Sequence, residues 1–236
     1  MKQFDLPQPI LYILIGAPGA GKSWFAKQFA ETHQIARVSD DAIRYALAPE
    51  GQVVDENAQA VERLARQMAE ELLRTGRSFI FDADASRRSK RIELIQLARR
   101  AGYQTLTIWV QTDRDTAMLR ASRYANTADN SMPALDEDAF EQLTKRITPP
   151  VAQGTEPSVV ISGRHTYSTQ AHAVHTRILR LYYGDRDQQG DEAPKTNGSV
   201  NLKDAPIPHP KTAPKRTHFD ISRPINVRGH EESRHS

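Results

Sequence analysis

Short, almost continuous apolar stretches alternate along the chain with longer stretches in which apolar residues recur every three or four positions. The continuous stretches predict buried strands at residues 10–15, 36–39, 78–81, 105–110 and 158–161. The spacing of three and four predicts helices at residues 22–31, 55–75, 89–101, 115–124, 136–146 and 168–181. Gly76 and Gly102 follow two of these helices and suit their C-terminal ends, because glycine accepts a left-handed backbone.

This alternation of strands and helices predicts an α/β fold with a doubly wound, parallel five-stranded sheet and helices on both faces. Strands that are apolar on consecutive residues agree with it, because helices cover both faces of such a sheet. Ligands of these sheets bind outside the carboxyl ends of the strands. Polar residues that directly follow the predicted strands are therefore the candidates for chemistry.

The pattern stops near residue 184. Residues 185–236 contain nine Lys/Arg, eight Asp/Glu and six of the 14 prolines, with Phe219 as their single aromatic residue. Because such a composition buries too little apolar surface to offset its chain entropy, we predict a folded domain at residues 1–184 and a disordered, proline-rich, mixed-charge tail. A weak contact with phosphate and a solvated tail without a specific partner both fit its charges.

The overall composition excludes several classes of protein. The 236 residues include no cysteine, which excludes disulfide frameworks, thiolate zinc sites and cysteine nucleophiles. The apolar stretch at residues 10–15 is far shorter than the roughly 20 residues of a membrane span, so we expect a cytoplasmic protein. The net charge of +3 permits a nucleic-acid partner without requiring one.

A phosphate-binding motif stands between the first strand and the first helix, with the sequence Gly16-Ala17-Pro18-Gly19-Ala20-Gly21-Lys22-Ser23. It matches G-x-x-x-x-G-K-[ST], whose glycines let backbone N–H groups surround phosphate oxygens at a helix N-terminus. Lys22 is expected to reach the β- and γ-phosphates and Ser23 to coordinate Mg²⁺. We therefore predict a P-loop NTPase fold that binds ATP and Mg²⁺, with Trp24 at the end of the ATP-binding segment.

Two other nucleotide-binding classes lack their signatures in this chain. We find no N-K-x-D stretch, by which GTPases read guanine, and no L-S-G-G-Q stretch of transport ATPases. A folded domain of about 184 residues has the size of a small phosphotransferase. The motif therefore favours such an enzyme over a large motor or a signalling GTPase.

Two candidate acidic positions follow the second and third strands. Asp41 and Arg44 are three residues apart, so a helical turn places them on one face, where Asp41 could take the proton of a hydroxyl and Arg44 could hold an anionic acceptor. Alternatively, Asp40 or Asp41 caps a helix. Asp82 closes the third strand and is predicted to hold Mg²⁺ through water, or else to bond the loop backbone without metal.

Arginines follow the fourth strand at Arg120 and Arg123. Phosphoryl transfer spreads charge over the γ-phosphate oxygens, which arginine stabilises, so a lid that carries both residues is one interpretation. A solvated helix face is the other.

Two further groups of residues are less specific. His165, His172 and His175 suggest a metal site only weakly, because three spread histidines without cysteine are usually ordinary surface or core residues. The basic residues Arg87, Arg88, Lys90 and Arg91 either guide phosphate groups to the acceptor site or form the solvated face of the following helix.

Together, these motifs resemble the P-loop kinases of the polynucleotide 5′-hydroxyl kinase type, with the zeta toxin-like and AAA_33-type ATP-binding proteins that share their core. The resemblance covers roughly residues 10–150 and rests on the phosphate-binding motif, Ser39 to Arg44, Phe81 to Asp84, the helix end at residues 98–103 and Leu119 to Arg123. It implies that Asp41 is the general base, that Arg44 binds the acceptor phosphate, and that Arg120 and Arg123 clasp ATP. Relatives usually carry asparagine where this chain has Asp84.

The leading hypothesis is therefore a Mg²⁺-dependent kinase that transfers the γ-phosphate of ATP to a hydroxyl acceptor, with a nucleic-acid 5′-hydroxyl or a nucleotide-like molecule as the preferred substrate. One alternative is a kinase of small molecules such as nucleotide sugars. Another is an ATPase or nucleotide-binding module that acts through a partner.

Overall fold

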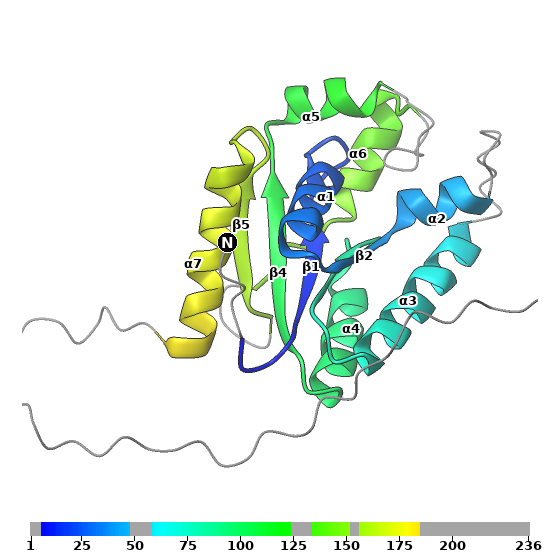
Figure 1. Ribbon diagram of the computed structural model, residues 1–236. Helices are drawn as coiled ribbons and strands as arrows, with labels where there is room; N and C mark the ends of the chain where they lie inside the picture. Colours follow the sequence, from blue (N-terminus) through cyan, green and yellow to red (C-terminus); the bar gives the residue numbers. More distant parts are fainter. Residues whose placement is uncertain (1–5, 48–57, 124–133, 152–155, 185–236) are drawn as a thin grey trace, which may run out of the picture. The chain divides into compact units, whose positions relative to one another are not determined.

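A computed structural model describes residues 6–47, 58–123, 134–151 and 156–184 of the chain. Within these residues one five-stranded sheet is built from β1 (Ile10–Ile15), β2 (Ala36–Ser39), β3 (Phe79–Asp82), β4 (Gln104–Gln111) and β5 (Ser158–Ser162). Every neighbouring pair is parallel, in the order β2-β3-β1-β4-β5 (Figure 1). The predicted doubly wound parallel sheet is confirmed, and each predicted strand end lies within one residue of the observed end.

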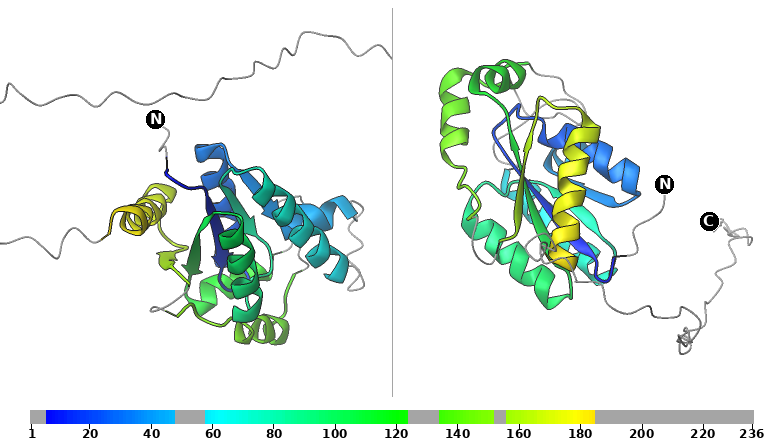
Figure 2. Two further views of the ribbon diagram at one scale, coloured as in Figure 1. Left: turned by 90° about the horizontal axis from the view of Figure 1, so that it is seen from below. Right: turned by 90° about the vertical axis from the view of Figure 1, so that its left-hand side faces the viewer.

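Helices cover both faces of this sheet (Figure 2). Apolar residues of α1 (Lys22–His33) and α7 (Tyr167–Tyr183) share one core with β1 and β4. On the opposite face, α3 (Ala58–Arg74) and α4 (Arg88–Arg100) form a second core with β1 and β3. β1 is buried from both sides, which explains why its consecutive rather than alternate residues are apolar.

The remaining helices lie at the carboxyl ends of the strands. They are α2 (Asp40–Leu47), α5 (Arg114–Ala121) and α6 (Glu137–Lys145). The sequence predicted only the first turn of α2 and extended α5 to residue 124. α5 ends earlier because Ser122 caps it and the Ser122 hydroxyl donates to the Leu119 carbonyl at 3.0 Å. Residues 55–57 and 124, which were predicted to be helical, lie outside the described residues.

A buried ion pair joins α4 to the segment before β5. Arg91 is fully buried and pairs with Glu156, and its guanidinium also donates to the carbonyls of Ala85 and Ser86 at 2.9 Å and of Thr148 at 2.8 Å. Arg91 therefore belongs neither to a phosphate-guiding cluster nor to a solvated face, and both interpretations of the basic residues are wrong at this position. Arg87 and Arg88 are exposed.

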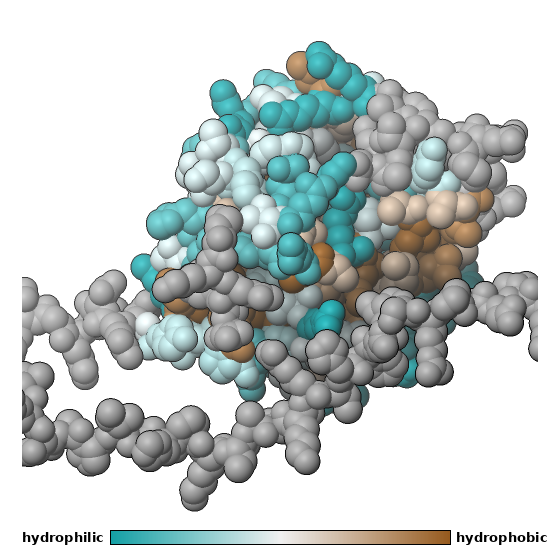
Figure 3. Space-filling view, viewed as in Figure 1, coloured by the Kyte–Doolittle hydropathy of each residue, from teal (hydrophilic) through white to brown (hydrophobic). Residues whose placement is uncertain are grey.

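The surface of the described residues includes an apolar area over α2 and α3 (Figure 3), to which Leu47, Leu64 and Met68 contribute. None of the described helices has the length and apolar character needed to cross a membrane. Helix α7 ends at Tyr183, next to the predicted domain boundary. The predicted tail, residues 185–236, lies outside the described residues, so its disorder stays a prediction.

Candidate nucleotide and acceptor site

The phosphate-binding motif forms a loop between β1 and α1, as the sequence predicted. Gly19 and Gly21 adopt left-handed backbone angles, with φ of 71° and 101°, and Gly21 is the N-cap of α1. Because the first amides of a helix have no intrahelical acceptor, the loop and the first turn of α1 present N–H groups to an anion. Residues 16–23 therefore have the geometry of a phosphate cradle.

Close packing against three other segments fixes this loop. A Cβ atom on Gly16 would collide with the Val110 carbonyl oxygen, and one on Gly19 would collide with the Ala117 carbonyl oxygen of α5. Gly163, after β5, approaches the Ala20 carbonyl oxygen so closely that it also has no room for a side chain. The sequence analysis did not identify Gly163, because its role arises from a contact with a residue more than 140 positions away.

Lys22 lies over the loop. Its Nζ donates to the Gly16 carbonyl at 3.0 Å and to the Ala17 carbonyl at 2.9 Å. Burial lowers the pKa of Lys22, whereas the negative charges of Asp82, Asp41, Asp84 and Asp40 raise it, in that order of influence. The four carboxylates come from α2, β3 and the loop after β3, and their negative charge acts on the ammonium group.

Asp82 is the buried carboxylate of this group. Burial raises the pKa of Asp82 to about 7, although Arg37, Lys22 and a hydrogen bond with the Ser23 side chain lower it. Arg37 Nε lies 3.4 Å from Asp82 Oδ2, an atom that makes no hydrogen bond with the described residues. A buried carboxylate next to a motif hydroxyl suits Mg²⁺, which takes oxygen ligands and commonly keeps waters and phosphate oxygens as the others. The residues present thus fit Mg²⁺ at Ser23 and Asp82.

Helix α2 presents the two acidic residues of its first turn. Ser39 is positioned as its cap, because the Ala42 N–H donates to Ser39 Oγ at 3.3 Å. Neither Asp40 nor Asp41 caps the helix, so that alternative is wrong. Asp41 and Arg44 lie on one face, as predicted from their spacing, with Arg44 Nη1 3.6 Å from Asp41 Oδ1.

The loop after β3 is tied to α2 and α3 through Asp84. The Asp84 N–H donates to Asp40 Oδ2 at 2.7 Å, and Lys90 Nζ donates to Asp84 Oδ2 at 2.8 Å. Lys90 also lies 2.9 Å from the Glu62 carboxylate of α3. Burial raises the pKa of Asp40 to about 6, although the Asp84 N–H and Arg44 lower it. The predicted acceptor residues are thus part of one network beside Lys22.

The predicted lid residues lie on the other side of the loop. Arg120 Nη1 donates to the Gly163 carbonyl at 3.3 Å, and Arg123 is exposed just after α5. Trp24 is 52% exposed on the first turn of α1. The roles of Arg120, Arg123 and Trp24 toward ATP stay predictions.

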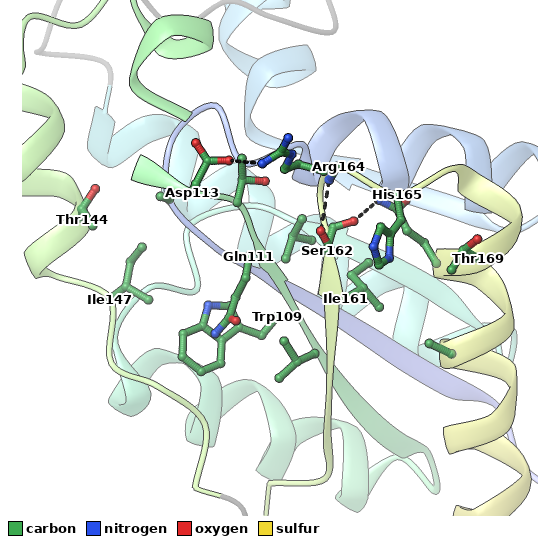
Figure 4. Close-up of a pocket in the computed structure, with 16 residues that line it drawn as sticks. Trp109, Gln111, Asp113, Thr144, Ile147, Ile161, Ser162, Arg164, His165 and Thr169 are labelled. Carbon is green, nitrogen blue, oxygen red and sulfur yellow. Dashed lines mark hydrogen bonds and ion pairs between the residues drawn. The ribbon is translucent and has the colours of Figure 1, made fainter. Parts of the chain in front are cut away.

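A hollow of about 800 Å³ opens beside the loop at the ends of β4 and β5 (Figure 4). Trp109 and Ile147 line one side, Thr169 lines the other, and Arg164 Nη1 lies 3.3 Å from Asp113 Oδ2 at the rim. β1 lies between β3 and β4 in the sheet. This hollow, at the ends of β4 and β5, and the carboxylates Asp41 and Asp82, at the ends of β2 and β3, therefore flank the loop on opposite sides.

The histidines form no metal centre in the part of the chain that the structure describes, where no three His, Cys, Asp or Glu residues come together as ligands. His175 Nε2 lies 3.0 Å from His33 Nε2, between α7 and α1. His165 lines the hollow beside the loop. The weak suggestion of a metal site at His165, His172 and His175 therefore gains no support.

A phosphate cradle after the first strand of a parallel sheet, followed by a lysine and a hydroxyl residue, defines a P-loop NTPase. The chain matches the model of the AAA_33 family, described as an AAA domain, over residues 11–150, and it belongs to this family. No curated protein matches the chain.

Solved structures of kinases share this fold. A candidate kinase from Chloroflexus aurantiacus is 22% identical, covers 72% of this chain and 98% of its own, and superimposes with a TM-score of 0.57. A gluconokinase from Sinorhizobium meliloti 1021 is 14% identical, with coverage of 75% and 94% and a TM-score of 0.52. Kti12 from Chaetomium thermophilum, solved with ADP-AlF3, is 17% identical, with coverage of 70% and 96% and a TM-score of 0.52. The chain is thus a P-loop NTPase with a kinase-like fold.

Proposed function

We propose that this protein is a Mg²⁺-dependent kinase that transfers the γ-phosphate of ATP to a hydroxyl group of an acceptor. The observation that carries the proposal is the position of Asp41. It is a second carboxylate, separate from the buried Asp82, and it stands on the first turn of α2 with Arg44 on the same face. A hydrolase needs only a positioned water, whereas a carboxylate paired with an arginine beside the transferred group suits the binding and deprotonation of an alcohol.

On this proposal, residues 16–23 bind the phosphates through backbone N–H groups, and Lys22 neutralises the charge of the β- and γ-phosphates. The nucleoside lies toward the hollow at the ends of β4 and β5, next to Arg164. Ser23 and Asp82 would hold Mg²⁺, which would supply positive charge against the negative charge of the phosphates. The hollow and α2 lie on opposite sides of the loop. ATP with its nucleoside in the hollow therefore directs its γ-phosphate toward α2.

Asp41 accepts the proton of the acceptor hydroxyl, and Arg44 positions the acceptor. The pairing of Arg44 Nη1 with Asp41 at 3.6 Å supports this assignment, because it places the guanidinium that would hold the acceptor beside the carboxylate that would take its proton. Arg120 and Arg123 stabilise the charge on the γ-phosphate oxygens when the lid closes and excludes water.

The test is transfer of labelled γ-phosphate from ATP with Mg²⁺ to a panel of acceptors: 5′-hydroxyl DNA and RNA oligonucleotides, nucleosides, nucleotide sugars and sugars. We expect labelled acceptor with the wild-type protein, none with Lys22→Met, and a strong decrease with Asp41→Asn. Labelled phosphate released at equal rates by the wild-type protein and Asp41→Asn, without any labelled acceptor, would favour a nucleotide-hydrolysing module that acts through a partner.

The resemblance to polynucleotide kinases implies a nucleic-acid 5′-hydroxyl as one of the acceptors that this test distinguishes, and a cytoplasmic location would give the enzyme both ATP and such ends. Label on an oligonucleotide 5′ end, lost in Asp41→Asn, would support it. Label on a nucleotide sugar or sugar would instead support a small-molecule kinase.

A further inference from the structure

The charges around Lys22 point to the class of acceptor. Resting on the kinase function proposed above, we propose that the acceptor is a small polyhydroxylated molecule that carries at most one anionic group. Three features of the acceptor side carry this inference: the number of carboxylates, the pairing of the cations, and the buried guanidinium donor of Arg44 beside the proposed base.

Carboxylates dominate the acceptor side. Asp40 and Asp41 stand on the first turn of α2, and Asp84 reaches them from the loop after β3, where its N–H bonds Asp40 at 2.7 Å. Both segments follow the carboxyl ends of β2 and β3, and β3 is the neighbour of β1, which leads into the phosphate-binding loop, so the three carboxylates form one cluster on this side of the loop. A carboxylate only accepts hydrogen bonds, so this side of the site suits a ligand that is rich in hydroxyl donors.

Most cations near these carboxylates already have partners. Lys90 lies between Asp84 at 2.8 Å and Glu62 at 2.9 Å. Arg37 donates to Ser39 Oγ at 2.8 Å and pairs with Asp82. Arg91 is buried with Glu156, away from any ligand. A ligand with several phosphates would therefore have to compete with carboxylates for these cations.

Arg44 stands beside the proposed base on α2. Its side chain is 16% exposed, and its buried Nη1 makes no hydrogen bond with the described residues, although Asp41 lies 3.6 Å away. A buried guanidinium donor without a hydrogen bond is unfavourable, and one anionic or polar group of a ligand would satisfy it. This residue thus provides a place for one such group next to the proposed base.

The neighbouring sequence does not add cations from the linkers. Residues 48–57, which connect α2 to α3, contain three acidic residues and no Lys or Arg, and residues 124–133 also contain no Lys or Arg. The exposed Arg87 and Arg88 follow Asp84 at the start of α4. A long anionic acceptor could use these two arginines, whereas a small polyol would not need them.

The test compares matched acceptors in the full-length protein by kcat/KM for transfer from Mg-ATP: a sugar alcohol, its aldonate with one carboxylate, its aldarate with two, and a 5′-hydroxyl oligonucleotide. We expect the sugar alcohol or the aldonate to exceed both other acceptors by about tenfold or more. Arg44→Gln should remove any advantage of the aldonate over the sugar alcohol. Asp84→Asn should raise kcat/KM for the aldarate relative to the aldonate, because it removes a negative charge from the acceptor side.

The double variant Arg87→Gln/Arg88→Gln serves as the control and should leave the values for the small acceptors unchanged. Preferred transfer to the oligonucleotide, decreased by this double variant, would overturn the acceptor class and leave the kinase function intact. Label on none of the acceptors, with only phosphate released, would contradict the kinase function itself and this inference with it.

Discussion

At the scale of single residues, the site depends on buried charge. Asp82 is 7% exposed, and its surroundings favour the protonated carboxyl over the carboxylate, since burial outweighs Arg37, Lys22 and the Ser23 hydrogen bond in setting its pKa. An ionised carboxylate is nevertheless what a divalent cation requires. Asp82 is thus placed where it suits binding rather than the stability of the folded chain.

The substitution Asp82→Asn should stabilise the protein at alkaline pH. Because the pKa is higher in the folded state, at about 7, than the usual value of 3.8, folding favours the neutral carboxyl. That contribution is complete below about pH 4 and is lost as the pH rises through 7, so the substitution should raise the free energy of unfolding at pH 8 by up to about 4 kcal/mol and change it little at pH 4. Denaturant unfolding with EDTA at the two pH values measures this.

The exposed Asp115→Asn is the control and should have no such pH-dependent effect. The same Asp82→Asn protein should bind ATP with a smaller dependence on Mg²⁺. A lower stability of Asp82→Asn than of the wild-type protein at pH 8 would show that its contacts with Arg37 and Ser23 outweigh its burial.

Asp41 and Asp40 provide a matched pair for the chemical step. Asp41→Asn should decrease kcat about 10²- to 10⁴-fold, because an amide cannot take the hydroxyl proton, and should change ATP affinity by less than about threefold. Asp40→Asn should decrease kcat much less, since an amide oxygen can still accept the Asp84 N–H. Rapid-quench measurements with one labelled acceptor compare the rate of transfer in the two variants. Equal losses would show that Asp41 has no special role as the base.

At the scale of elements, the phosphate-binding loop is held by neighbours far away in sequence. Helix α5 packs against Gly19, and the segment after β5 packs against Ala20 through Gly163. Thr112, after β4, donates its hydroxyl to the same Ala20 carbonyl at 2.9 Å. The loop therefore keeps its shape only when β4, β5 and α5 are in place, which couples nucleotide binding to the packing of the whole sheet edge.

Gly163→Ala tests this coupling. A methyl group at this position collides with the Ala20 carbonyl and the Thr112 hydroxyl, so we expect a loss of stability of about 1–3 kcal/mol and at least a tenfold loss of ATP affinity. Gly102→Ala is the control. Its added methyl group would meet no atom within 4 Å, so the substitution adds only the backbone strain of a φ of 81°. Thermal unfolding and calorimetry with ATP measure both effects. Unchanged ATP affinity in Gly163→Ala would mean that this contact does not shape the loop.

The Arg91–Glu156 pair joins elements rather than binding ligand. Glu156→Gln leaves a buried guanidinium without its counter-charge and should decrease the free energy of unfolding by about 3–5 kcal/mol. Arg66→Gln, which breaks exposed pairs with Glu70 and Glu93, should change it by less than about 1 kcal/mol. Urea unfolding distinguishes the two. Equal effects would argue that the buried pair adds no more than a surface pair.

At the scale of the whole molecule, the position of β1 between β3 and β4 organises the function. The chain runs toward β2 after β1 and toward β5 after β4, so the sheet order reverses between β1 and β4, and ligands of such sheets bind at this crevice. The β2–β3 side carries the acceptor network, and the β4–β5 side carries the hollow proposed for the nucleoside. A transfer reaction between two ligands can therefore use both sides of one loop.

Removal of residues 185–236 tests the predicted domain boundary. Because α7 ends at Tyr183 and packs through Val174 and Ile178 into the core, we expect residues 1–184 to unfold in one cooperative transition with the midpoint and ATP affinity of the full chain. Circular dichroism melting and calorimetry measure both. A broad transition, or a midpoint lowered by several degrees, would show that the tail contributes to the folded domain.

The sequence by itself determined the fold class, the strand positions and the phosphate-binding loop. These features depend on local patterns: the run of apolar residues in a doubly covered strand, the periodicity of a helix, and the fixed spacing of glycines, Lys22 and Ser23. The candidates Asp41 and Asp82 could also be predicted from the sequence, because they follow or close a strand. Arg44 could be predicted because it stands three residues after Asp41. They could be named without knowledge of which strands are neighbours.

Only the tertiary structure decided which distant residues meet. Arg37 reaches Asp82 because β2 pairs with β3, Gly163 reaches Ala20 because β5 lies beyond β4, and Arg91 finds Glu156 across 65 positions. The same packing pairs Arg91 with Glu156 and pairs Lys90 with Asp84 and Glu62, although the sequence allowed both cations to guide phosphate groups. Such contacts leave no periodic signal in the chain, since they depend on how strands order and helices pack rather than on spacing along the sequence.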